Sequence, residues 1–514
     1  MSRQNHQDRV IACILKGHNF GHDVQVITQV FFANAKFMFN EINVNNLDKA
    51  SLNNFNNNKI SDKGYTVIST LSGKLCTGEL YNDGVLISSH TLELQDSAIA
   101  IIKRTLMLAL FHALKKAINH PTPWGALTGV RPAKKVRLWL EEDVTEDVIA
   151  NWLRDIYQCR EDKIQLAINV ARAEEKIISR YNCSAGMGLY ISVPFCPSRC
   201  LYCSFVADQK TKKNDTDLHS RYLKALAKEC KSININSLNT IYIGGGTPTA
   251  LSEKNLAELL EIAADFTKIA KDLEYTVEAG RPDSLNKEKL SLLKDYGVNR
   301  IAINPQTLND ETLVRIGRNH TAKDFYNAYE MAQQIGFDNI NVDVIAGLPG
   351  ETPNHMKQTM EGLKKLKPAH ITVHTLAVKR ASKLNENRIN KCFSETSDFE
   401  TIDTMLSIAQ EVCESLQLAP YYMYRQKNMA GHCENVGYSL PGYECLYNVV
   451  MMAETQTVIA AGAGAVTKIV ENTQNGTLIS RKFNPKDVEI YIKRINESND
   501  NEQHTNIEHN AKIR

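Results

Sequence analysis

The second half of this 514-residue chain alternates short apolar segments with helical ones, and this alternation limits the possible folds more than any other feature. Six short segments from residue 187 onward are rich in β-branched residues, as strands are: 188–193, 239–244, 273–279, 300–304, 340–347 and 370–377. Helical stretches separate most of them, at 217–234, 252–270, 285–296, 321–335 and 355–366. Strands and helices in this order predict βαβ units and a parallel sheet.

Six such units are too few for a closed eight-stranded barrel. We therefore predict an α/β fold that contains a partial, open (β/α)6 TIM-like barrel at residues 180–395. In a barrel of this kind, the functional groups lie at the carboxyl ends of the strands.

The flanking regions have other patterns. Residues 1–165 predict an N-terminal α+β region, with strands at 22–32 and 64–75, a polar loop at 52–62, and helices at 97–119 and 145–180. Residues 396–495 predict a mainly helical C-terminal extension, and the polar tail at 496–514 predicts disorder. The sequence assigns no role to the N-terminal region.

Composition excludes several classes of protein. A net charge of +2 gives no general electrostatic reason to bind nucleic acid or an anionic membrane. Residues 98–116 are apolar, but Lys103 and Arg104 interrupt them, which favours a buried helix over a membrane span. Twelve cysteines without an N-terminal signal segment predict reduced thiols and a cytoplasmic location.

A basic loop at 123–135 contains Arg131, Lys134 and Lys135. These cations could bind an anion there. A solvated turn is the more common role for such a loop, because lysine and arginine are mostly exposed.

Polar residues recur where the predicted strands end. Glu278 ends its strand, Gln306 follows the next, and Asp343 lies inside an otherwise apolar strand. Glycines 244–246 close the second strand, and a cysteine-rich loop follows the first. Chance or a structural network explains one or two of these features more easily than all five. We therefore predict a site at this end of the barrel.

The cysteine-rich loop VPFCPSRCLYCSF (193–205) contains Cys196, Cys200 and Cys203. Structural zinc usually takes four cysteine or histidine ligands, and the possible fourth ligands, His219 and Cys183, do not have a standard spacing. A disulfide would leave one thiol over. A 4Fe-4S cluster fits better, because three thiolates leave one iron open for a small molecule with an amine and a carboxylate.

The spacing Cys196-x3-Cys200-x2-Cys203, with an aromatic residue before the third cysteine, resembles the signature of the radical S-adenosylmethionine (SAM) superfamily. The resemblance implies that SAM binds the open iron. It also implies that an electron from the reduced cluster cleaves SAM into methionine and a 5′-deoxyadenosyl radical, which takes a hydrogen atom from the substrate.

Further segments narrow the family. Together they resemble oxygen-independent coproporphyrinogen III oxidase over roughly residues 187–470, and most of all its HemZ-type coproporphyrinogen dehydrogenase branch. The matching segments are LYISVPFC (189–196), IYIGGGTPTAL (241–251), VEAGRP (277–282), RIAINPQTL (300–308), IGRNHT (316–321), VDVIAGLPGET (342–352) and YRQKNMAGHCENVGYSLPG (424–442).

By this resemblance, the three cysteines ligate the cluster and a set of residues contacts SAM. The predicted SAM contacts are Tyr190, Tyr202, Gly245, Gly246, Thr247, Glu278, Gln306, Arg318, Asp343, Ala377 and Val466. Taken alone, each polar member would more often be a satisfied structural residue, and packing is the competing role for each apolar or aromatic member. The shared placement at strand ends and the order of the motifs favour the SAM site instead.

The resemblance implies anaerobic oxidative decarboxylation of coproporphyrinogen III to protoporphyrinogen IX in heme biosynthesis, with residues 396–495 covering the substrate. A reduced flavodoxin or a ferredoxin-type protein would donate the electron. Cations that could hold the substrate carboxylates are Lys379, Arg380, Arg425 and Lys427, although a solvated role is as plausible for each.

Two departures leave other functions open. The oxidase has a cysteine where this chain has Phe205, and a histidine where it has Ser192. Relatives that lack the extra cysteine include heme-binding chaperones, so a heme carrier is the second hypothesis. A radical SAM enzyme that acts on another substrate is the third.

Overall fold

The computed structural model describes residues 10–32, 35–42, 64–181, 183, 186–203, 216–270, 272–377, 382, 398–426, 429, 432–473 and 476–497. The predicted loop at 52–62 and nearly all of the predicted tail lie outside these residues. The chain divides into two compact units, the first being Met1–Pro132 with Trp139–Ala167 and the second Ala133–Leu138 with Ile168–Arg514.

The first unit is built on a sheet with the order β2-β1-β3-β4-β5 in the described residues. Its strands are β1 (Val10–Lys16), β2 (Lys36–Ile42), β3 (Tyr65–Ser72), β4 (Leu75–Asn82) and β5 (Val85–Glu93). The helix α3 (Ile99–Ala117) packs on this sheet so closely that a Cβ on Gly78 would lie 2.4 Å from the Cα of Leu110. The strand predicted at 64–75 and the helix predicted at 97–119 are confirmed.

The segment 22–32, predicted as a strand, is instead the helix α1 (Gly21–Phe31). Its buried residues are Val24, Ile27, Thr28, Val30 and Phe31. These positions recur three and four apart, which is the spacing of one helix face. The strand prediction gave too much weight to the β-branched composition of the segment and too little to this period.

Helices follow the sheet of the first unit along the chain. They are α4 (Pro132–Glu141), α5 (Glu146–Asn151), a π-helical turn (Trp152–Ile156) and α6 (Glu161–Arg180). The helices predicted over 145–180 are therefore confirmed, with one interruption. The described residues contain no helix that is both long enough and apolar enough to span a bilayer.

The basic segment at 123–135 is not a loop throughout, because α4 begins at Pro132 and includes Lys134 and Lys135. Proline suits the first turn of a helix, where its missing N–H is not needed. In the second unit, the Nζ of Lys134 lies 2.7 Å from a carboxylate oxygen of Glu454. This ion pair favours a structural role for Lys134, and anion binding by the segment stays a hypothesis.

The second unit contains the predicted open barrel. The six strands β6 to β11 lie side by side in chain order, and each is parallel to its neighbours. They are β6 (Met187–Val193), β7 (Leu238–Gly245), β8 (Glu274–Val277), β9 (Arg300–Ala302), β10 (Ile340–Ala346) and β11 (His370–Thr375). The partial (β/α)6 barrel is therefore confirmed.

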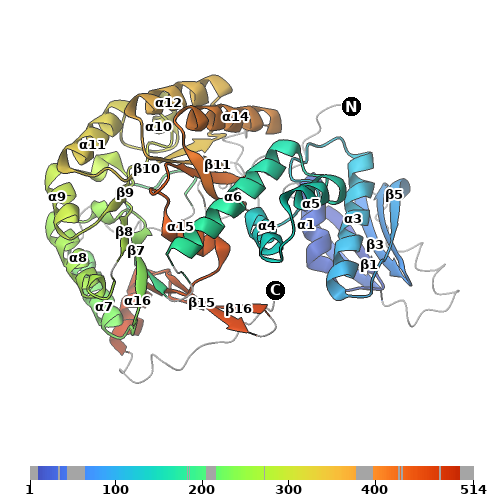
Figure 1. Ribbon diagram of the computed structural model, residues 1–514, viewed down its shortest axis with the longest axis horizontal. Coiled ribbons are helices and arrows are strands. Elements are labelled where there is room, and N and C mark those ends of the chain that lie inside the picture. Colours follow the sequence, from blue (N-terminus) through green and yellow to red (C-terminus); the bar gives the residue numbers. More distant parts are fainter. Residues whose placement is uncertain are drawn as a thin grey trace. The chain divides into compact units, whose positions relative to one another are not determined.

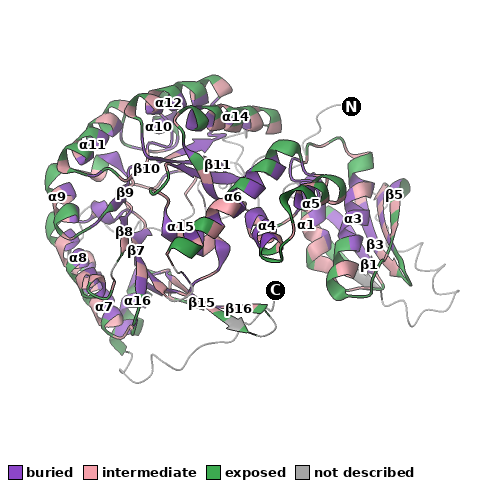
Figure 2. Ribbon diagram, viewed as in Figure 1, coloured by how far each residue is buried: buried purple, intermediate pink, exposed green. Residues whose placement is uncertain are grey.

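Helices cover the outside of this barrel, and Figure 1 shows them as an arc around the strands. They are α7 (Thr216–Lys231), α8 (Glu253–Thr267), α9 (Lys287–Asp295), α10 (Asp310–Arg315), α11 (Ala322–Ile335) and α12 (Pro353–Leu366). Figure 2 shows the strands mostly buried and the helices exposed on their outer faces. Since β6 and β10 are buried at nearly every position, their apolar runs match strands covered on both faces.

The C-terminal extension is not mainly helical. Besides α14 (Phe399–Ser415), α15 (Leu446–Ala453) and α16 (Val488–Glu497), its described residues form five strands. β12 (Ala419–Tyr424) and β13 (Asn435–Ser439) extend the sheet beyond β11, whereas β14 (Val458–Ala461), β15 (Val466–Thr473) and β16 (Gly476–Phe483) extend it beyond β6. The short strands escaped prediction because β pairing depends on neighbours far away in the chain.

Glu274 at the start of β8 caps α15. Its carboxylate accepts hydrogen bonds from the backbone N–H groups of Leu446 at 2.6 Å and Tyr447 at 3.0 Å. We expect Glu274→Ala to lower the free energy of unfolding by about 2 kcal/mol, because two helix-terminal donors lose their charged acceptor. Chemical denaturation measures this effect, and the exposed Glu288→Ala is the control. Equal stability of the two variants would contradict the capping role.

Candidate functional site

The cysteine loop is held against the end of the second barrel strand by backbone hydrogen bonds. The N–H of Gly246 donates to the carbonyl of Val193 at 2.7 Å, and the N–H of Thr247 donates to that of Phe195 at 2.7 Å. The hydroxyl of Thr247 also donates to the sulfur of Cys196 at 3.7 Å. Gly246, Thr247 and Cys196, which were predicted to share one site, are therefore brought together.

The three thiols are close enough to influence one another. Burial raises the pKa of Cys196 to about 11, Cys200 and Cys203 raise it further, and Thr247 and Arg281 oppose the shift. Crowded, buried thiolates need a cation to compensate them, and iron supplies that charge. No cluster of three or more His, Cys, Asp or Glu side chains that could hold one metal ion occurs in the described residues. A 4Fe-4S cluster does not need such convergence, because each of its irons takes its own thiolate.

The glycines at the end of β7 leave space that side chains would fill. Gly245 has a φ of 103°, which favours glycine. A Cβ on Gly244 would lie 2.8 Å from the carboxyl carbon of Glu278, and one on Gly246 would lie 2.3 Å from the carbonyl oxygen of Phe195. These glycines therefore let backbone or a ligand approach closely at the end of β7.

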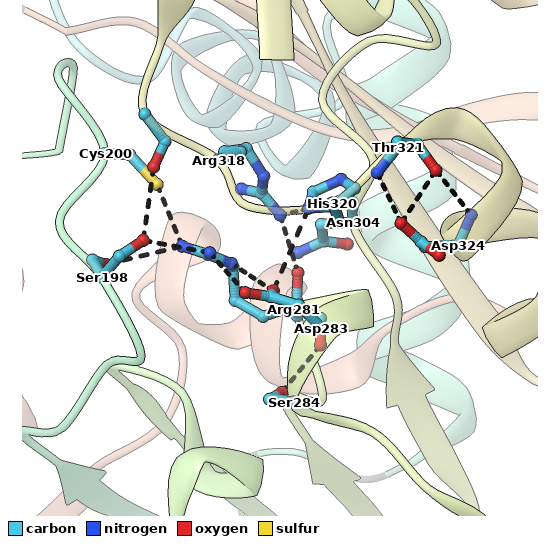
Figure 3. Close-up of polar contacts among 12 residues, drawn as sticks. Ser198, Cys200, Arg281, Asp283, Ser284, Asn304, Arg318, His320, Thr321 and Asp324 are labelled. Atoms are coloured by element: carbon cyan, nitrogen blue, oxygen red, sulfur yellow. Dashed lines mark hydrogen bonds and ion pairs between the residues drawn. The ribbon is translucent and has the colours of Figure 1, made fainter. Parts of the chain in front are cut away.

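Arg281, which sequence reasoning missed, lies beside the second cysteine (Figure 3). Its guanidinium donates to the sulfur of Cys200 at 3.5 Å and to the hydroxyl of Ser198 at 3.1 Å. It also pairs with Asp283 at 2.8 Å. Its position in the loop after β8, three residues beyond Glu278, was the signal that could have pointed to it.

Arg318 contacts three loops at the same end of the barrel. Its guanidinium donates to the hydroxyl of Tyr202 at 3.0 Å and to the carbonyls of Gly280 at 3.1 Å and Asn304 at 2.6 Å. Its Nε is buried without a hydrogen-bond partner. A buried donor of this kind is costly unless a ligand or water satisfies it, so Arg318 has hydrogen-bonding capacity left for an anion.

Gln306 also has an unused hydrogen-bonding atom, in this case an acceptor. Its side-chain Oε1 is buried and has no hydrogen-bond partner. Its φ of 69° is unusual for a residue other than glycine, and its backbone forms a parallel bridge with Val344 of β10. Strained backbone persists where the surroundings enforce it, and such positions cluster at binding sites.

The pKa values of two carboxyl groups of the site shift in opposite directions. Burial raises the pKa of Glu278 to about 7, and the nearby Asp343 adds to the shift, while the Tyr242 hydroxyl donates to Glu278 at 2.6 Å. Burial would also raise the pKa of Asp343, but contacts with His374 and Asn341 hold it below its ordinary value. Carboxyl groups whose pKa values are pushed apart can take different roles in one site.

Glu278 should make the stability of the protein depend on pH. Its native pKa lies above the ordinary 4.5, so between about pH 4.5 and pH 7 the unfolded chain releases a proton that the native protein keeps. The contribution of Glu278 to the free energy of unfolding therefore falls as pH rises through that window, and it has reached its lowest value above pH 7. We expect Glu278→Gln, whose amide is always neutral, to remove this part of the pH dependence.

Chemical denaturation of both proteins without cofactors, at several pH values across the window, measures the difference. The free energy of unfolding of the unmutated protein should fall relative to that of Glu278→Gln as pH rises. Parallel pH profiles would show that Glu278 titrates normally.

The remaining predicted contacts are Tyr190, Ala377 and Val466. Tyr190 stacks with Tyr242 and Tyr447, with ring centroids 6.1 and 6.0 Å apart, which is a packing contact. Ala377 forms an isolated bridge with Met429, and Val466 begins β15. None of these three facts tests a contact with SAM, so those assignments stay predictions.

The structure describes only some of the positions that bear on the substrate: the two departures from the oxidase and the cations predicted to bind its carboxylates. The hydroxyl of Ser192 donates to the carbonyl of Ala463 at 2.8 Å, so it serves the backbone of the extension. Of the predicted carboxylate-binding cations, the structure describes Arg425, which donates to the carbonyl of His432 at 3.1 Å. Phe205, Lys379, Arg380 and Lys427 lie outside the described residues.

Comparisons with known proteins agree with this geometry. Residues 190–363 match the model of the radical SAM superfamily. Over 409 residues, the chain is 34% identical to the oxygen-independent coproporphyrinogen-III oxidase-like protein HemZ of Bacillus subtilis (strain 168). This match covers 78% of this chain and 80% of that protein. The chain belongs to this family of radical SAM proteins. The predicted family is confirmed.

Members of the radical SAM coproporphyrinogen oxidase-like family do not all carry the name of an oxidase. The chain is 39% identical over 194 residues to the heme chaperone HemW of Bacillus subtilis (strain 168), covering 37% of this chain and 50% of that protein. The solved structure of coproporphyrinogen III oxidase (HemN) from Escherichia coli has a TM-score of 0.48 and 18% identity over 64% of this chain and 72% of that chain. Because one relative is named an oxidase-like protein and another a heme chaperone, membership alone does not fix the reaction.

As a radical SAM protein, this chain has a 4Fe-4S cluster and SAM as its cofactors. The strand ends fit both groups. Three mutually interacting thiols can hold the cluster, the glycines leave space beside it, and the partnerless Nε of Arg318 and Oε1 of Gln306 can bind a polar ligand.

Proposed function

We propose that this protein is an oxygen-independent coproporphyrinogen III dehydrogenase, which converts coproporphyrinogen III to protoporphyrinogen IX in heme biosynthesis. The observation that carries the proposal is the extent of the match to HemZ. The match covers 78% of the chain, which is a larger share than the second unit makes up. The match therefore extends into the first, N-terminal unit. Matches to heme chaperones named HemW cover 37% to 60% of the chain, less than the match to HemZ.

In this proposal, Cys196, Cys200 and Cys203 hold the cluster and leave one iron to SAM. Bound together, the two cofactors supply the one-electron chemistry that removes a hydrogen atom from the substrate. Arg318 offers its unused Nε to the carboxylate of SAM. The ionised Asp343 accepts hydrogen bonds from the ribose hydroxyls, and Glu278 accepts from another polar group of SAM.

The other predicted contacts complete the SAM site. Gly245, Gly246 and Thr247 lie along the methionine part, and Gln306 contributes its partnerless acceptor. The aromatic rings of Tyr190 and Tyr202, with Ala377 and Val466, provide apolar surface.

The substrate chemistry follows from the four propionates of coproporphyrinogen III. Removal of a hydrogen atom from the β-carbon of a propionate leaves a radical. Loss of carbon dioxide and one electron then gives a vinyl group, and this happens at two propionates. The reaction needs a low-potential one-electron donor, such as a reduced flavodoxin or ferredoxin in the cytoplasm, and an electron acceptor for the second electron.

The test is an anaerobic incubation of the reconstituted full chain with SAM, a reductant and coproporphyrinogen III. We expect protoporphyrinogen IX and cleaved SAM, and neither from the Cys200→Ala control. Tight binding and transfer of heme without turnover would favour the chaperone. Cleavage of SAM without either result would indicate another substrate.

A further inference from the structure

The guanidinium of Arg281 uses all of its hydrogen-bond donors, and one of them reaches a predicted cluster ligand (Figure 3). Nε and Nη2 donate to the two carboxylate oxygens of Asp283, both at 2.8 Å. Nη2 also donates to the hydroxyl of Ser198 at 3.1 Å, and Nη1 donates to its carbonyl at 3.4 Å. The remaining donor points to the sulfur of Cys200 at 3.5 Å. Since a guanidinium has five N–H groups, its position is fully determined.

This contact is shielded from water. Arg281 is 4% exposed and Cys200 is 8% exposed, so the positive charge acts on the thiolate through little solvent. Asp283 shares the charge through a bidentate pair. Burial and the neighbouring Arg318 lower the pKa of His320 to about 4, so this histidine, 4.0 Å from Asp283, adds no charge at neutral pH.

We propose that Arg281 raises the reduction potential of the 4Fe-4S cluster through its contact with the Cys200 sulfur, and that Asp283 positions the guanidinium and moderates its charge. Reduction adds one electron from a low-potential donor to the cluster, and no bond forms or breaks. The reduced cluster carries one more negative charge, which the guanidinium stabilises. Net charge and hydrogen bonds to the sulfurs are known to set such potentials.

Arg281 is thus a tuning residue, because it acts on the cluster through the Cys200 sulfur. The inference rests on the cluster and not on the proposed substrate. It applies equally to a dehydrogenase, to a chaperone or to an enzyme with another substrate.

An equilibrium redox titration of the anaerobically reconstituted full chain tests this, with the paramagnetic signal of the reduced cluster as readout and without SAM or porphyrinogen. At the potential that half-reduces the native cluster, Arg281→Gln should lower the ratio of reduced to oxidised cluster about tenfold, the effect of one hydrogen bond to a charged group. Arg281→Lys, which keeps the charge, should recover part of this loss. Asp283→Asn should shift the ratio in the opposite direction.

Iron and sulfide per chain are measured first, so that each variant is compared at known cluster content. A purely structural role would reduce that content but leave the potential of the remaining clusters unchanged, and this result would overturn the proposal. If Arg281→Gln takes up no cluster, the redox titration of Asp283→Asn tests the proposal instead. The side chain of residue 283 contacts Arg281 and not the Cys200 sulfur, so this variant should keep the cluster. A potential that is unchanged or lower in Asp283→Asn also overturns the proposal.

Discussion

Replacement of Cys200 by alanine should abolish the iron–sulfur cluster and, with it, all cleavage of SAM. Cys200 is the most buried of the three cysteines of the loop, and it accepts the contact from Arg281. Without its sulfur, two thiolates remain for a cluster that needs three protein ligands, and Arg281 is left with an unmet buried donor. We expect bound iron and sulfide to fall at least about tenfold, since even changes around metal ligands cost 10–100-fold in affinity.

Metal analysis and the visible absorbance of the reconstituted protein measure this loss. Cys413→Ala is the matched control, because Cys413 is fully buried in α14 and lies outside the cysteine loop. It should keep the cluster. Far-ultraviolet circular dichroism should show that both variants are folded, including the N-terminal unit. A Cys200→Ala protein with the native cluster signals would refute the assigned ligand set.

The barrel was predictable because its strands and helices repeat a local pattern. Runs such as 340–347 are mostly apolar, with Asn341 and Asp343 as exceptions, and the helices between them are amphipathic, so neighbouring residues suffice to assign both. The segment 22–32 shows where that approach fails. Its composition favours a strand, but its apolar period belongs to the helix α1. Composition and periodicity gave different predictions for this segment, and the prediction from periodicity was correct.

Part of the site could also be predicted, for the same reason. Glu278 directly follows β8, Gln306 lies four residues after β9, and the cysteines fall within one loop, so their shared location follows from the βαβ order. For Arg281 the sequence offers only its place in the loop after β8, because its role depends on a contact with Cys200 across 81 residues of chain. The strands of the C-terminal extension escaped for a similar reason, since β14 pairs with β6 from a distant part of the sequence.

Gly246→Ala should be the most damaging single-methyl change at the site. Gly246 does not have a positive φ, so alanine would suit its backbone conformation. The conflict is one of space, because the new Cβ would lie 2.3 Å from the carbonyl oxygen of Phe195 and 2.7 Å from that of Val193. Both are backbone atoms and cannot move aside as a flexible side chain can. Phe195 directly precedes Cys196, so relief of the clash displaces a cluster ligand.

We expect Gly246→Ala to lower the free energy of unfolding by about 1–3 kcal/mol and to weaken SAM binding about tenfold or more. Gly280→Ala is the matched control in the same site, because its Cβ would meet Asn304 at 3.4 Å, an ordinary contact, and its φ is not positive either. Cluster content and equilibrium SAM binding, measured on both reconstituted variants, separate the two cases. If Gly246→Ala matched Gly280→Ala in both measurements, the close approach between the cysteine loop and β7 would not be what the cofactors require. The three-cysteine loop would then owe its position to side chains such as Arg281 and not to this glycine.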